Sequence, residues 1–467
     1  MNYINHTDLL FQRCNHCNQK LLTPRANVRQ VVVCPRCSSQ LNDGRSWSLN
    51  RLSILAITLL MLAPIAFWQP LISIHLLGSQ INANVIEGIR LINQQGDPFT
   101  ASIVAFCAIA APLLLPILIL LLSIGQHINL NLRPILLVLS HIKEWVMLDV
   151  YLIALGIAAI KMQDYASVFI GHGLVAFITM SILSLLILIH INLDELWQKF
   201  YPINNKKVQD NSLTCTACHY TGPANWNGKC KRCHRPLHYR EPYSLQKTWA
   251  ALIAAMVLLF PANLMPISIF YLNGQRLEDT IYSGVVSLID SGNWPIAVIV
   301  FIASILVPFI KIIIMILLLF SIHLKSNTDP ILRMKLLRFV SWIGRWSMLD
   351  LFVIALMMTL VNRDQLMSFT MGPAALYFGS AVILTILAVE WLDSRLIWDS
   401  YGKSKPAKWT LWRNIRSHIT QTQANFAFLA IAFSRYFHCR LAFVSTLGWT
   451  RNGYHYWVYI RTWSRRQ

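Results

Sequence analysis

Residues 14–37 read CNHCNQKLLTPRANVRQVVVCPRC, and residues 215–233 read CTACHYTGPANWNGKCKRC. Each segment contains two CxxC pairs, separated by 16 residues in the first segment and by 11 in the second. A CxxC turn places two thiolates on one side of a tight knuckle, and two knuckles can surround one soft cation. The sequence therefore predicts two zinc-ribbon-like modules, whose ligands are Cys14, Cys17, Cys34, Cys37, Cys215, Cys218, Cys230 and Cys233.

Long apolar stretches follow each cysteine segment. Hydrophobic residues make up 55% of the 467 residues and charged residues only 13%, against about 25% charged in soluble domains. Crossing the hydrocarbon core takes roughly 20 apolar residues. Two of the stretches are short, and extending them back to Pro134 and Pro330 gives helices over 135–160 and 336–361. We predict an all-α polytopic protein with eight transmembrane helices, from apolar stretches at 52–76, 99–124, 146–160, 166–191, 248–272, 295–322, 347–361 and 366–389.

Basic residues alternate between the two sides that these spans define. The segment 1–51 and the loops 125–145, 192–247 and 323–346 carry 23 Lys and Arg residues, whereas the four alternate loops carry 4. Since Lys and Arg concentrate in cytoplasmic loops, we predict that both termini and both cysteine modules are cytoplasmic. The polar first 50 residues do not resemble a signal peptide, so the first apolar run is expected to be an anchor. The net charge of +20 fits this bias and attraction to anionic lipids, and no nucleic-acid recognition motif accompanies it.

The two halves of the chain are similar at an offset near 200 residues. Cys34 and Cys37 align with Cys230 and Cys233, and Trp145-Val-Met-Leu-Asp149 aligns with Trp346-Ser-Met-Leu-Asp350. Each half has an even number of predicted spans, so the repeats are parallel and share one orientation.

This repeat divides the chain into five parts. They are a ribbon module at 10–45, a four-helix unit at 50–195, a second ribbon at 211–240, a second four-helix unit at 246–400 and a tail at 403–467. The tail carries eleven Lys and Arg residues and no Asp or Glu, and its apolar run Phe426–Phe433 is too short to span a membrane. The sequence assigns this tail no function.

The favoured role of the cysteine modules is structural zinc binding. Cytosolic thiols stay reduced, and a ribbon of about 30 residues needs a metal to supply its folding energy. Iron in a rubredoxin-like site is the main alternative, and redox-active CxxC pairs are a third. We expect the nearby histidines to be surface or knuckle residues rather than ligands: His16, His219, His234 and His238. The segment 222–230 departs from the phosphate-loop spacing, so no nucleotide is expected to bind.

Three ionisable residues fall well within predicted spans, namely Asp149, Lys311 and Asp350. A charge inside a membrane is costly unless it is paired or hydrated, and it is therefore a candidate functional residue. The repeat places Leu115 opposite Lys311, so the predicted ion pair is Lys311 with Asp350. This centre is either a static salt bridge or part of a hydrated lipid or proton path. Trp145 and Trp346 lie one helical turn before the aspartates, where packing is favoured over ligand stacking.

The doubled cysteine modules, the four spans after each and the two W-x-M-L-D segments resemble the paraquat-inducible protein A family over about residues 10–400. The resemblance implies a bacterial inner-membrane protein that is not an enzyme and works with a periplasmic mammalian-cell-entry (MCE) domain protein. The pair would move phospholipids between the inner and outer membranes. The resemblance also implies zinc at the eight cysteines and a functional polar cluster at Asp149, Lys311 and Asp350. A membrane redox or metal-responsive stress protein, or a stand-alone exporter, remains an alternative.

Overall fold

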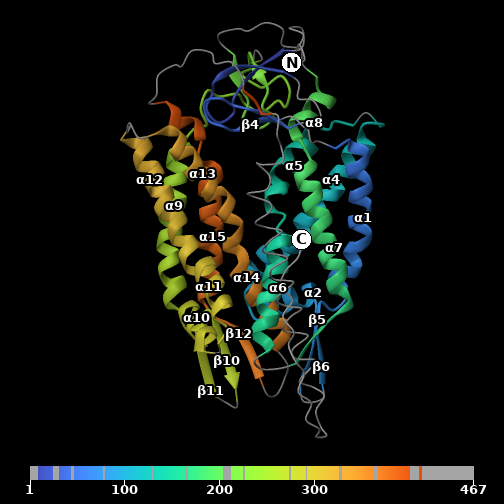
Figure 1. The fold of residues 1–467 in the computed structure, drawn as a ribbon, viewed down its shortest axis with the longest axis vertical. Helices are drawn as coiled ribbons and strands as arrows, with labels where there is room; N and C mark the ends of the chain where they lie inside the picture. Colours follow the sequence, from blue (N-terminus) through green and yellow to red (C-terminus); the bar gives the residue numbers. More distant parts are fainter. Residues whose placement is uncertain are drawn as a thin grey trace, which may run out of the picture. The chain divides into compact units, whose positions relative to one another are not determined.

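The computed structural model describes most of the chain up to residue 399. The described residues are 9–24, 31–43, 47–76, 79–128, 130–163, 167–202, 212–224, 227–272, 275–290, 292–324, 329–361, 367–399 and 410–412. The cysteine modules lie at one end of a helical bundle, and two small β-sheets lie at the other end (Figure 1).

The first repeat consists of helices with one three-stranded sheet, in the order β6-β5-β7. Its elements are α1 (Leu49–Trp68), β5 (Ile72–Leu76), β6 (Ser79–Ala83), α2 (Val85–Gln94), α3 (Pro98–Ala105), the π-helical turn η2 (Phe106–Ala110), α4 (Ala111–Gly125), α5 (Arg133–Trp145), α6 (Leu148–Gln163), β7 (Ser167–Ile170), α7 (His172–His190) and α8 (Leu193–Phe200).

The second repeat follows the same order, and its sheet is β11-β10-β12. Its elements are α9 (Ser244–Leu264), β10 (Ser268–Leu272), β11 (Gln275–Asp279), α10 (Ile281–Asp290), α11 (Trp294–Phe301), the π-helical turn η3 (Ile302–Leu306), α12 (Val307–His323), α13 (Pro330–Ile343), the 3-10 turn η4 (Gly344–Met348), α14 (Leu349–Val361), β12 (Met367–Met371), α15 (Ala374–Trp391) and the 3-10 turn η5 (Ser394–Trp398).

The fold is mostly helical, but it is not all-α as predicted. Strands β5 and β10 each pair with a hairpin partner and with a third strand about 100 residues later. Residues 268–272, SIFYL, favour a strand, and they are followed by Asn273-Gly274, a dipeptide that is typical of hairpins. Sequence analysis missed these strands because each is only four or five residues long and lies between long apolar runs.

Seven helical stretches of the described residues are long and apolar enough to cross a membrane, and their outer surfaces carry large apolar side chains. Met61 on α1 and Phe260 on α9 are both 72% exposed, as expected of residues that face lipid. The expected continuous helix over 135–160 is not observed. Val146 has an extended conformation (ψ 108°), which ends α5 at Trp145, and α6 begins at Leu148. In the second repeat, η4 instead joins α13 to α14, and Pro330–Met358 forms one span.

The two repeats pack against each other along α6 and α14. The rings of Tyr151 and Phe352, which occupy equivalent positions at an offset of 201 residues, lie 5.3 Å apart between centroids. Within each repeat, the first helix packs against the last, as α1 against α7 and α9 against α15. The W-x-M-L-D segments therefore lie at the centre of the bundle, where the two repeats meet.

The cysteine modules are small antiparallel ribbons. In ribbon 1 (residues 9–43), β1 (Leu9–Arg13) pairs with β2 (Lys20–Pro24), and β3 (Val31–Val33) pairs with β4 (Gln40–Asp43). In ribbon 2 (residues 213–237), β8 (Leu213–Thr214) pairs with β9 (Thr221–Gly222). A strand from the predicted tail, β13 (Thr410–Trp412), pairs with β3, so the tail contributes to ribbon 1. Its apolar run Phe426–Phe433 lies outside the described residues.

Candidate functional site

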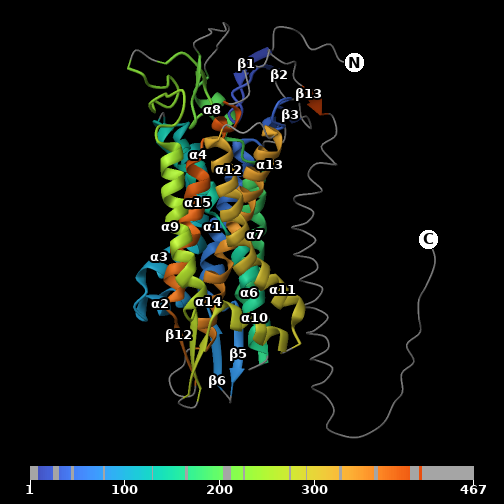
Figure 2. The ribbon, with the colours of Figure 1, turned by 90° about the vertical axis from the view of Figure 1, so that its left-hand side faces the viewer.

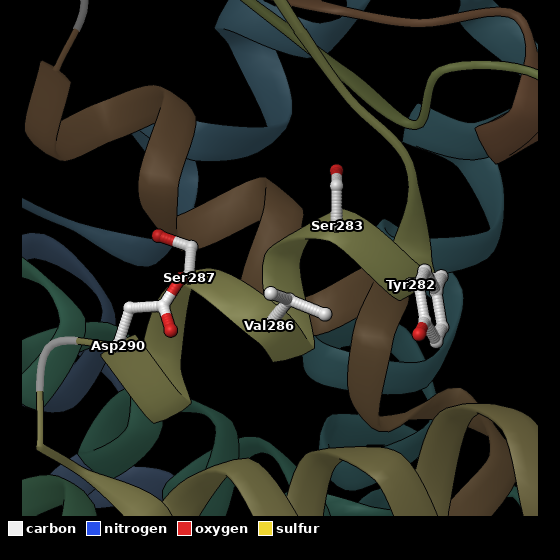
Figure 3. A pocket seen from close by; sticks show the side chains of 5 residues that line it. All are labelled: Tyr282, Ser283, Val286, Ser287 and Asp290. Carbon is white, nitrogen blue, oxygen red and sulfur yellow. The ribbon is translucent and has the colours of Figure 1, made fainter.

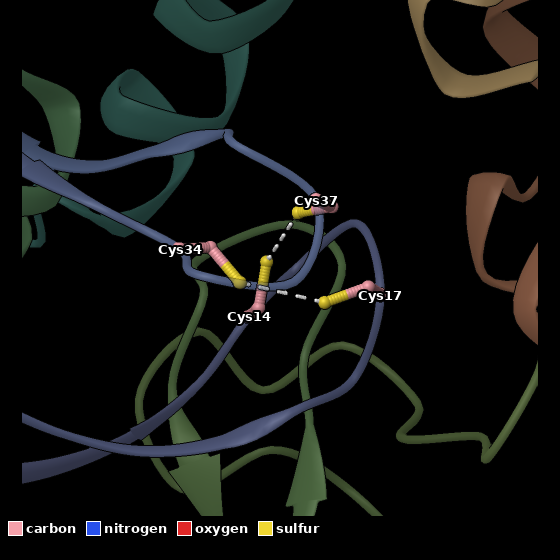
Figure 4. Close-up of side chains that lie close together, drawn as sticks. All are labelled: Cys14, Cys17, Cys34 and Cys37. Carbon is pink, nitrogen blue, oxygen red and sulfur yellow. Dashed lines mark hydrogen bonds between the residues drawn. The ribbon is translucent and has the colours of Figure 1, made fainter. Parts of the chain in front are cut away.

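The eight predicted ligand cysteines form two buried clusters, as the spacing predicts. In each cluster the four Sγ atoms lie within 4.8 Å of one another. The Sγ atoms of Cys14 and Cys37 are 3.5 Å apart, and those of Cys17 and Cys34 are 3.6 Å apart (Figure 4). A tetrahedron of sulfurs around one ion at a metal–sulfur distance of about 2.3 Å has edges of about 3.8 Å. The clusters therefore fit a single four-coordinate ion.

All four CxxC turns have the same backbone geometry. The residue that follows the second cysteine of each pair has a positive φ of 55–62°, at Asn18, Ser38, His219 and His234. The backbone N–H of this residue donates to the carbonyl oxygen of the first cysteine, as Asn18 does to Cys14 at 2.8 Å. This turn directs both thiols to the same side, which is the arrangement that a metal requires.

The four thiols of each cluster shift one another's pKa in opposite directions. Hydrogen bonding with Cys17 lowers the pKa of Cys14 to about 7, whereas hydrogen bonding with Cys14 raises the pKa of Cys17. In ribbon 2, the contact with Cys215 raises the pKa of Cys230, but hydrogen bonds from Cys218 and Cys233 outweigh it and lower that pKa to about 7. Hydrogen bonding with Cys215 raises the pKa of Cys218. Each cluster therefore favours a mixture of thiolates and thiols, and binding of a metal would release the remaining protons.

The histidines near the clusters are not among the potential ligands found in the described residues. His16, His234 and His238 are exposed. His219 faces α8, and its Nδ1 lies 2.7 Å from Oδ1 of Asp194. Burial alone would lower the pKa of His219, but the Asp194 carboxylate raises it above the usual value.

Ribbon 1 docks on the second repeat rather than on the helices that directly follow it. Arg338 of α13 donates from Nη2 to the carbonyl oxygen of Cys37 at 2.8 Å. Arg395 of η5 donates from Nε to the carbonyl oxygen of Asn15 at 3.0 Å. The guanidinium of Arg36 lies 4.7 Å from the ring centroid of Trp398. The cysteines of ribbon 1 accordingly share one buried cluster with α9, α12 and α13 side chains.

Ribbon 2 docks on the first repeat in the reciprocal way. Arg133 of α5 donates from Nε to the carbonyl oxygen of Arg232 at 2.9 Å, and Arg232 donates from Nε to the carbonyl oxygen of Tyr201 at 3.2 Å. The two ribbons also contact each other, since the Arg13 amide donates to Thr221 Oγ1 at 3.3 Å. Each cysteine module thus links the two helical units, an arrangement that the sequence did not reveal.

The predicted intramembrane aspartates lie at corresponding helix starts. Asp149 is in the first turn of α6 and Asp350 is in the first turn of α14, where unpaired backbone N–H groups favour a carboxylate. Ser304 donates from its hydroxyl to Oδ1 of Asp350 at 2.6 Å. This serine is buried in the π-helical turn η3. Sequence analysis missed it, although it is a polar residue within an apolar span, opposite Ala108 in the repeat alignment.

Lys311 does not form the predicted ion pair with Asp350. Its side chain is 1% exposed, and among the described residues its Nζ has no hydrogen-bond partner. It lies beside η4, with Nζ 3.9 Å from the position that a Cβ of Gly344 would occupy. The prediction was wrong because Ser304, on the turn just before α12, takes the position next to the carboxylate. A buried, unpaired amine remains beside the second W-x-M-L-D segment.

The two tryptophans lie at the helix junctions. Trp145 is the last residue of α5, and its ring packs edge-on against Phe106 of η2, with 5.7 Å between centroids. Trp346 is half-buried in η4. Packing at the junction is the arrangement seen for Trp145.

Comparisons with known proteins place the chain among membrane transport proteins. The family model for paraquat-inducible protein A matches residues 49–201 and 245–402. "Lipophilic envelope-spanning tunnel protein A" of Escherichia coli K12 is 55% identical over 392 residues, covering 84% of this chain and 92% of that protein. A "Probable intermembrane transport protein" of Haemophilus influenzae is 41% identical over 402 residues, covering 84% and 97%. "Intermembrane transport protein PqiA" of Escherichia coli K12 is 28% identical over 406 residues, covering 84% and 96%. No solved structure matches the chain.

Proposed function

The chain belongs to the paraquat-inducible protein A family, and from that membership we propose that it is an inner-membrane component of a bacterial intermembrane lipid transport system. The observation that carries the proposal is its similarity, along more than nine-tenths of each relative, to two proteins named for intermembrane transport and one named for an envelope-spanning tunnel. The protein would pass phospholipid between the inner membrane and a periplasmic tunnel. It would do so without catalysing a reaction.

We propose an eight-crossing topology with both ribbons in the cytoplasm. Seven crossings are the continuous helical stretches, and the remaining crossing, in the first repeat, is formed by α5 and α6 together. It corresponds to the continuous span Pro330–Met358 of the second repeat. The distribution of Lys and Arg supports this orientation. The sheets β6-β5-β7 and β11-β10-β12 then face the periplasm. They supply a docking surface for the MCE-domain partner that the family resemblance implies.

We propose structural zinc for the two cysteine clusters. Four buried thiols in knuckles suit zinc, and the closed shell of four protein ligands leaves no open position for chemistry. A bound ion would cross-link each ribbon and contribute its folding energy. The protein's own residues then fix the ribbons in place: Arg338 and Arg395 hold ribbon 1, and Arg133 holds ribbon 2. Tightly held iron, or reversible oxidation of the thiols, would favour the redox-sensing alternative.

We propose that Lys311, Ser304 and Asp350 form the polar centre of the lipid path. An unpaired buried amine is costly in hydrocarbon and is retained where a ligand or proton can use it. An ammonium group at this depth suits a phosphate, and Asp350, which accepts a hydrogen bond from Ser304, supplies a carboxylate in the same repeat. Asp149 belongs to the equivalent position of the first repeat, where Ala108 and Leu115 replace the serine and the lysine.

The test uses matched substitutions in the two repeats. Lys311→Met removes the amine at nearly constant length, and Leu115→Met changes the equivalent position without altering its polarity. In a strain that depends on this protein for outer-membrane integrity, Lys311→Met should abolish function and Leu115→Met should not. Full function of Lys311→Met at normal protein level would remove the polar centre from the transport path. Failure of the chain to co-purify with an MCE-domain protein would favour a stand-alone exporter.

A further inference from the structure

Two short helical arms lie on opposite sides of the bundle at the end distant from the ribbons (Figure 2). Arm 1 consists of α2 and α3, and arm 2 consists of α10 and α11, its counterpart in the second repeat. Arm 1 packs against α14 of the other repeat. It is also fixed by Gln95, whose Oε1 accepts a hydrogen bond from the backbone N–H of Met371 on β12 at 3.1 Å.

Arm 2 is arranged differently. In the part of the chain that the structure describes, α10 packs mainly on α11 and β11, and α11 continues into η3. Neither helix packs on α6 to the extent that arm 1 packs on α14. A Cβ built on Gly284, in the middle of α10, meets no atom within 4 Å. Arm 1 is therefore closed on the opposite repeat, and arm 2 is open.

The flanks of the two central helices show the same difference. Ile354 and Met357 of α14 are buried, at 6% and 2% exposure. Their counterparts on α6, Ile153 and Gly156, are both half-exposed. The helix surface that is buried on α14, against which arm 1 packs, is therefore partly exposed at the equivalent positions of α6.

The free face of α10 is apolar where that of α2 is polar. Val286 is 38% exposed and Ile289 is 51% exposed, whereas their positions in α2 are held by Arg90 and Asn93. The side chains beside this face line an open hollow of about 540 Å³, all from this one helix: Tyr282, Ser283, Val286, Ser287 and Asp290 (Figure 3). In a membrane protein an exposed apolar helix face is expected to contact lipid acyl chains, as on α1 and α9.

We propose that arm 2 is a lateral gate for lipid. It closes on α6 as arm 1 closes on α14, and in the open state a phospholipid acyl chain passes between α10 and α6. The pivot is available at both ends of α11, because Gly292 has a positive φ of 75° and η3 interrupts the α-helix. Since η3 carries Ser304, closure also moves the donor that holds Asp350. The gate thereby connects lipid entry to the polar centre, and this part rests on the proposed function.

Matched pairs of spin labels test the gate on the full-length protein in nanodiscs of Escherichia coli lipid, with Cys107→Ala and Cys439→Ala and with the ribbon cysteines kept. The test pair is Ile289→Cys with Leu152→Cys, on arm 2 and α6. The control pair is Asn93→Cys with Val353→Cys, at the equivalent positions on arm 1 and α14. Pulsed EPR then measures both distances in nanodiscs and in lipid-free detergent.

The control pair should give one short distance in both conditions. The test pair should give a longer distance and, in one of the conditions, a second population that coincides with the control distance. A single unchanging distance for the test pair in both conditions would overturn the gate. The EPR distances do not depend on lipid transport, so the two proposals can fail separately. If the protein transports lipid while arm 2 stays immobile, only the gate is refuted. If arm 2 moves in a protein that carries no lipid, only the proposed function is refuted.

Discussion

The two repeats share an order of elements but differ at their centres. Both have a π-helical turn, a proline-containing span and a W-x-M-L-D junction. Only the second repeat has a serine that donates to its aspartate and a buried lysine, where the first has Ala108 and Leu115. Arm 1 of the first repeat packs on α14, whereas arm 2 shows no comparable packing on α6 among the described residues. We therefore propose that the polar centre functions in the second repeat only.

The largest effect is expected from removing a metal site, because the ribbons cross between repeats. Apparent metal-binding free energies of small zinc modules are about 10–16 kcal/mol. Replacing Cys14 and Cys17 by serine should therefore unfold ribbon 1 and release its contacts with Arg338 and Arg395. Hydrogen exchange should rise in α13 and η5 of the second repeat.

The reciprocal variant, Cys215→Ser with Cys218→Ser, should raise exchange in α5 and α8 of the first repeat, where Arg133 and Asp194 hold ribbon 2. Exchange that rises only in the helices directly following each ribbon would show that the modules do not dock crosswise.

The second prediction separates function from stability at Lys311. Its amine is buried without a hydrogen-bond partner among the described residues, so Lys311→Met should raise the melting temperature while it abolishes lipid transport. Removing an unpaired intramembrane charge is worth about 2.5–3.5 kcal/mol on insertion scales. Leu115→Lys should produce the opposite change in stability. A lower melting temperature for Lys311→Met would mean that the amine is a structural element.

The third prediction concerns the serine that distinguishes the two π-helical turns. Ser304→Ala removes a hydrogen bond to a carboxylate, a loss of about 1.5–3 kcal/mol. Ala108→Ser, at the equivalent position of the first repeat, should change stability little. Thermal unfolding of the two variants measures the difference, and equal effects would show that the turns have equivalent environments.

A fourth prediction is that alanine substitutions at Gly171 and Gly372, which occupy equivalent positions in the two repeats, destabilise the protein equally. A Cβ at Gly171 would lie 2.0 Å from the carbonyl oxygen of Pro70, and a Cβ at Gly372 would lie 2.0 Å from that of Pro266. Gly171→Ala and Gly372→Ala should each destabilise the protein by about 1–3 kcal/mol through overpacking. If alanine were tolerated at only one of these two positions, the sheets β6-β5-β7 and β11-β10-β12 would not be structurally equivalent.

The smallest effect is expected at the docking residues of η5 and α8. Arg395 of η5 is buried and holds ribbon 1, whereas its counterpart Asp194 forms a partly exposed pair with His219. Asp194→Asn should cost roughly 0–1 kcal/mol, as exposed ion pairs do, and Arg395→Gln should cost more. Chemical unfolding of the protein that carries each substitution compares the two losses, and a larger loss for Asp194→Asn would reverse this order.

Much of this architecture could be predicted from local patterns. Cysteine spacing identified both clusters, and hydropathy identified the apolar stretches. The predicted start at residue 135 lies two residues from the start of α5 at Arg133, whereas α13 begins at Pro330, six residues before the predicted start at 336. The break at Val146 could not be foreseen, because apolar residues continue through it.

The crosswise docking of the ribbons and the contact between Ser304 and Asp350 also escaped prediction. Both join residues from distant parts of the chain, and hydropathy and spacing carry no information about such tertiary contacts. The same reason explains why the sequence predicted an ion pair between Lys311 and Asp350, whereas in the structure Ser304 donates a hydrogen bond to Asp350.

The most direct test of the account is whether phospholipid reaches the buried centre of the second repeat. A diazirine amino acid at Met348, which is fully buried beside the polar centre, is compared with the same residue at Met147, its counterpart, and at the lipid-exposed Ile313. After illumination in cells, mass spectrometry should find phospholipid adducts at positions 313 and 348 and few at 147. Adducts at 313 with none at 348 would contradict a lipid path through the second repeat.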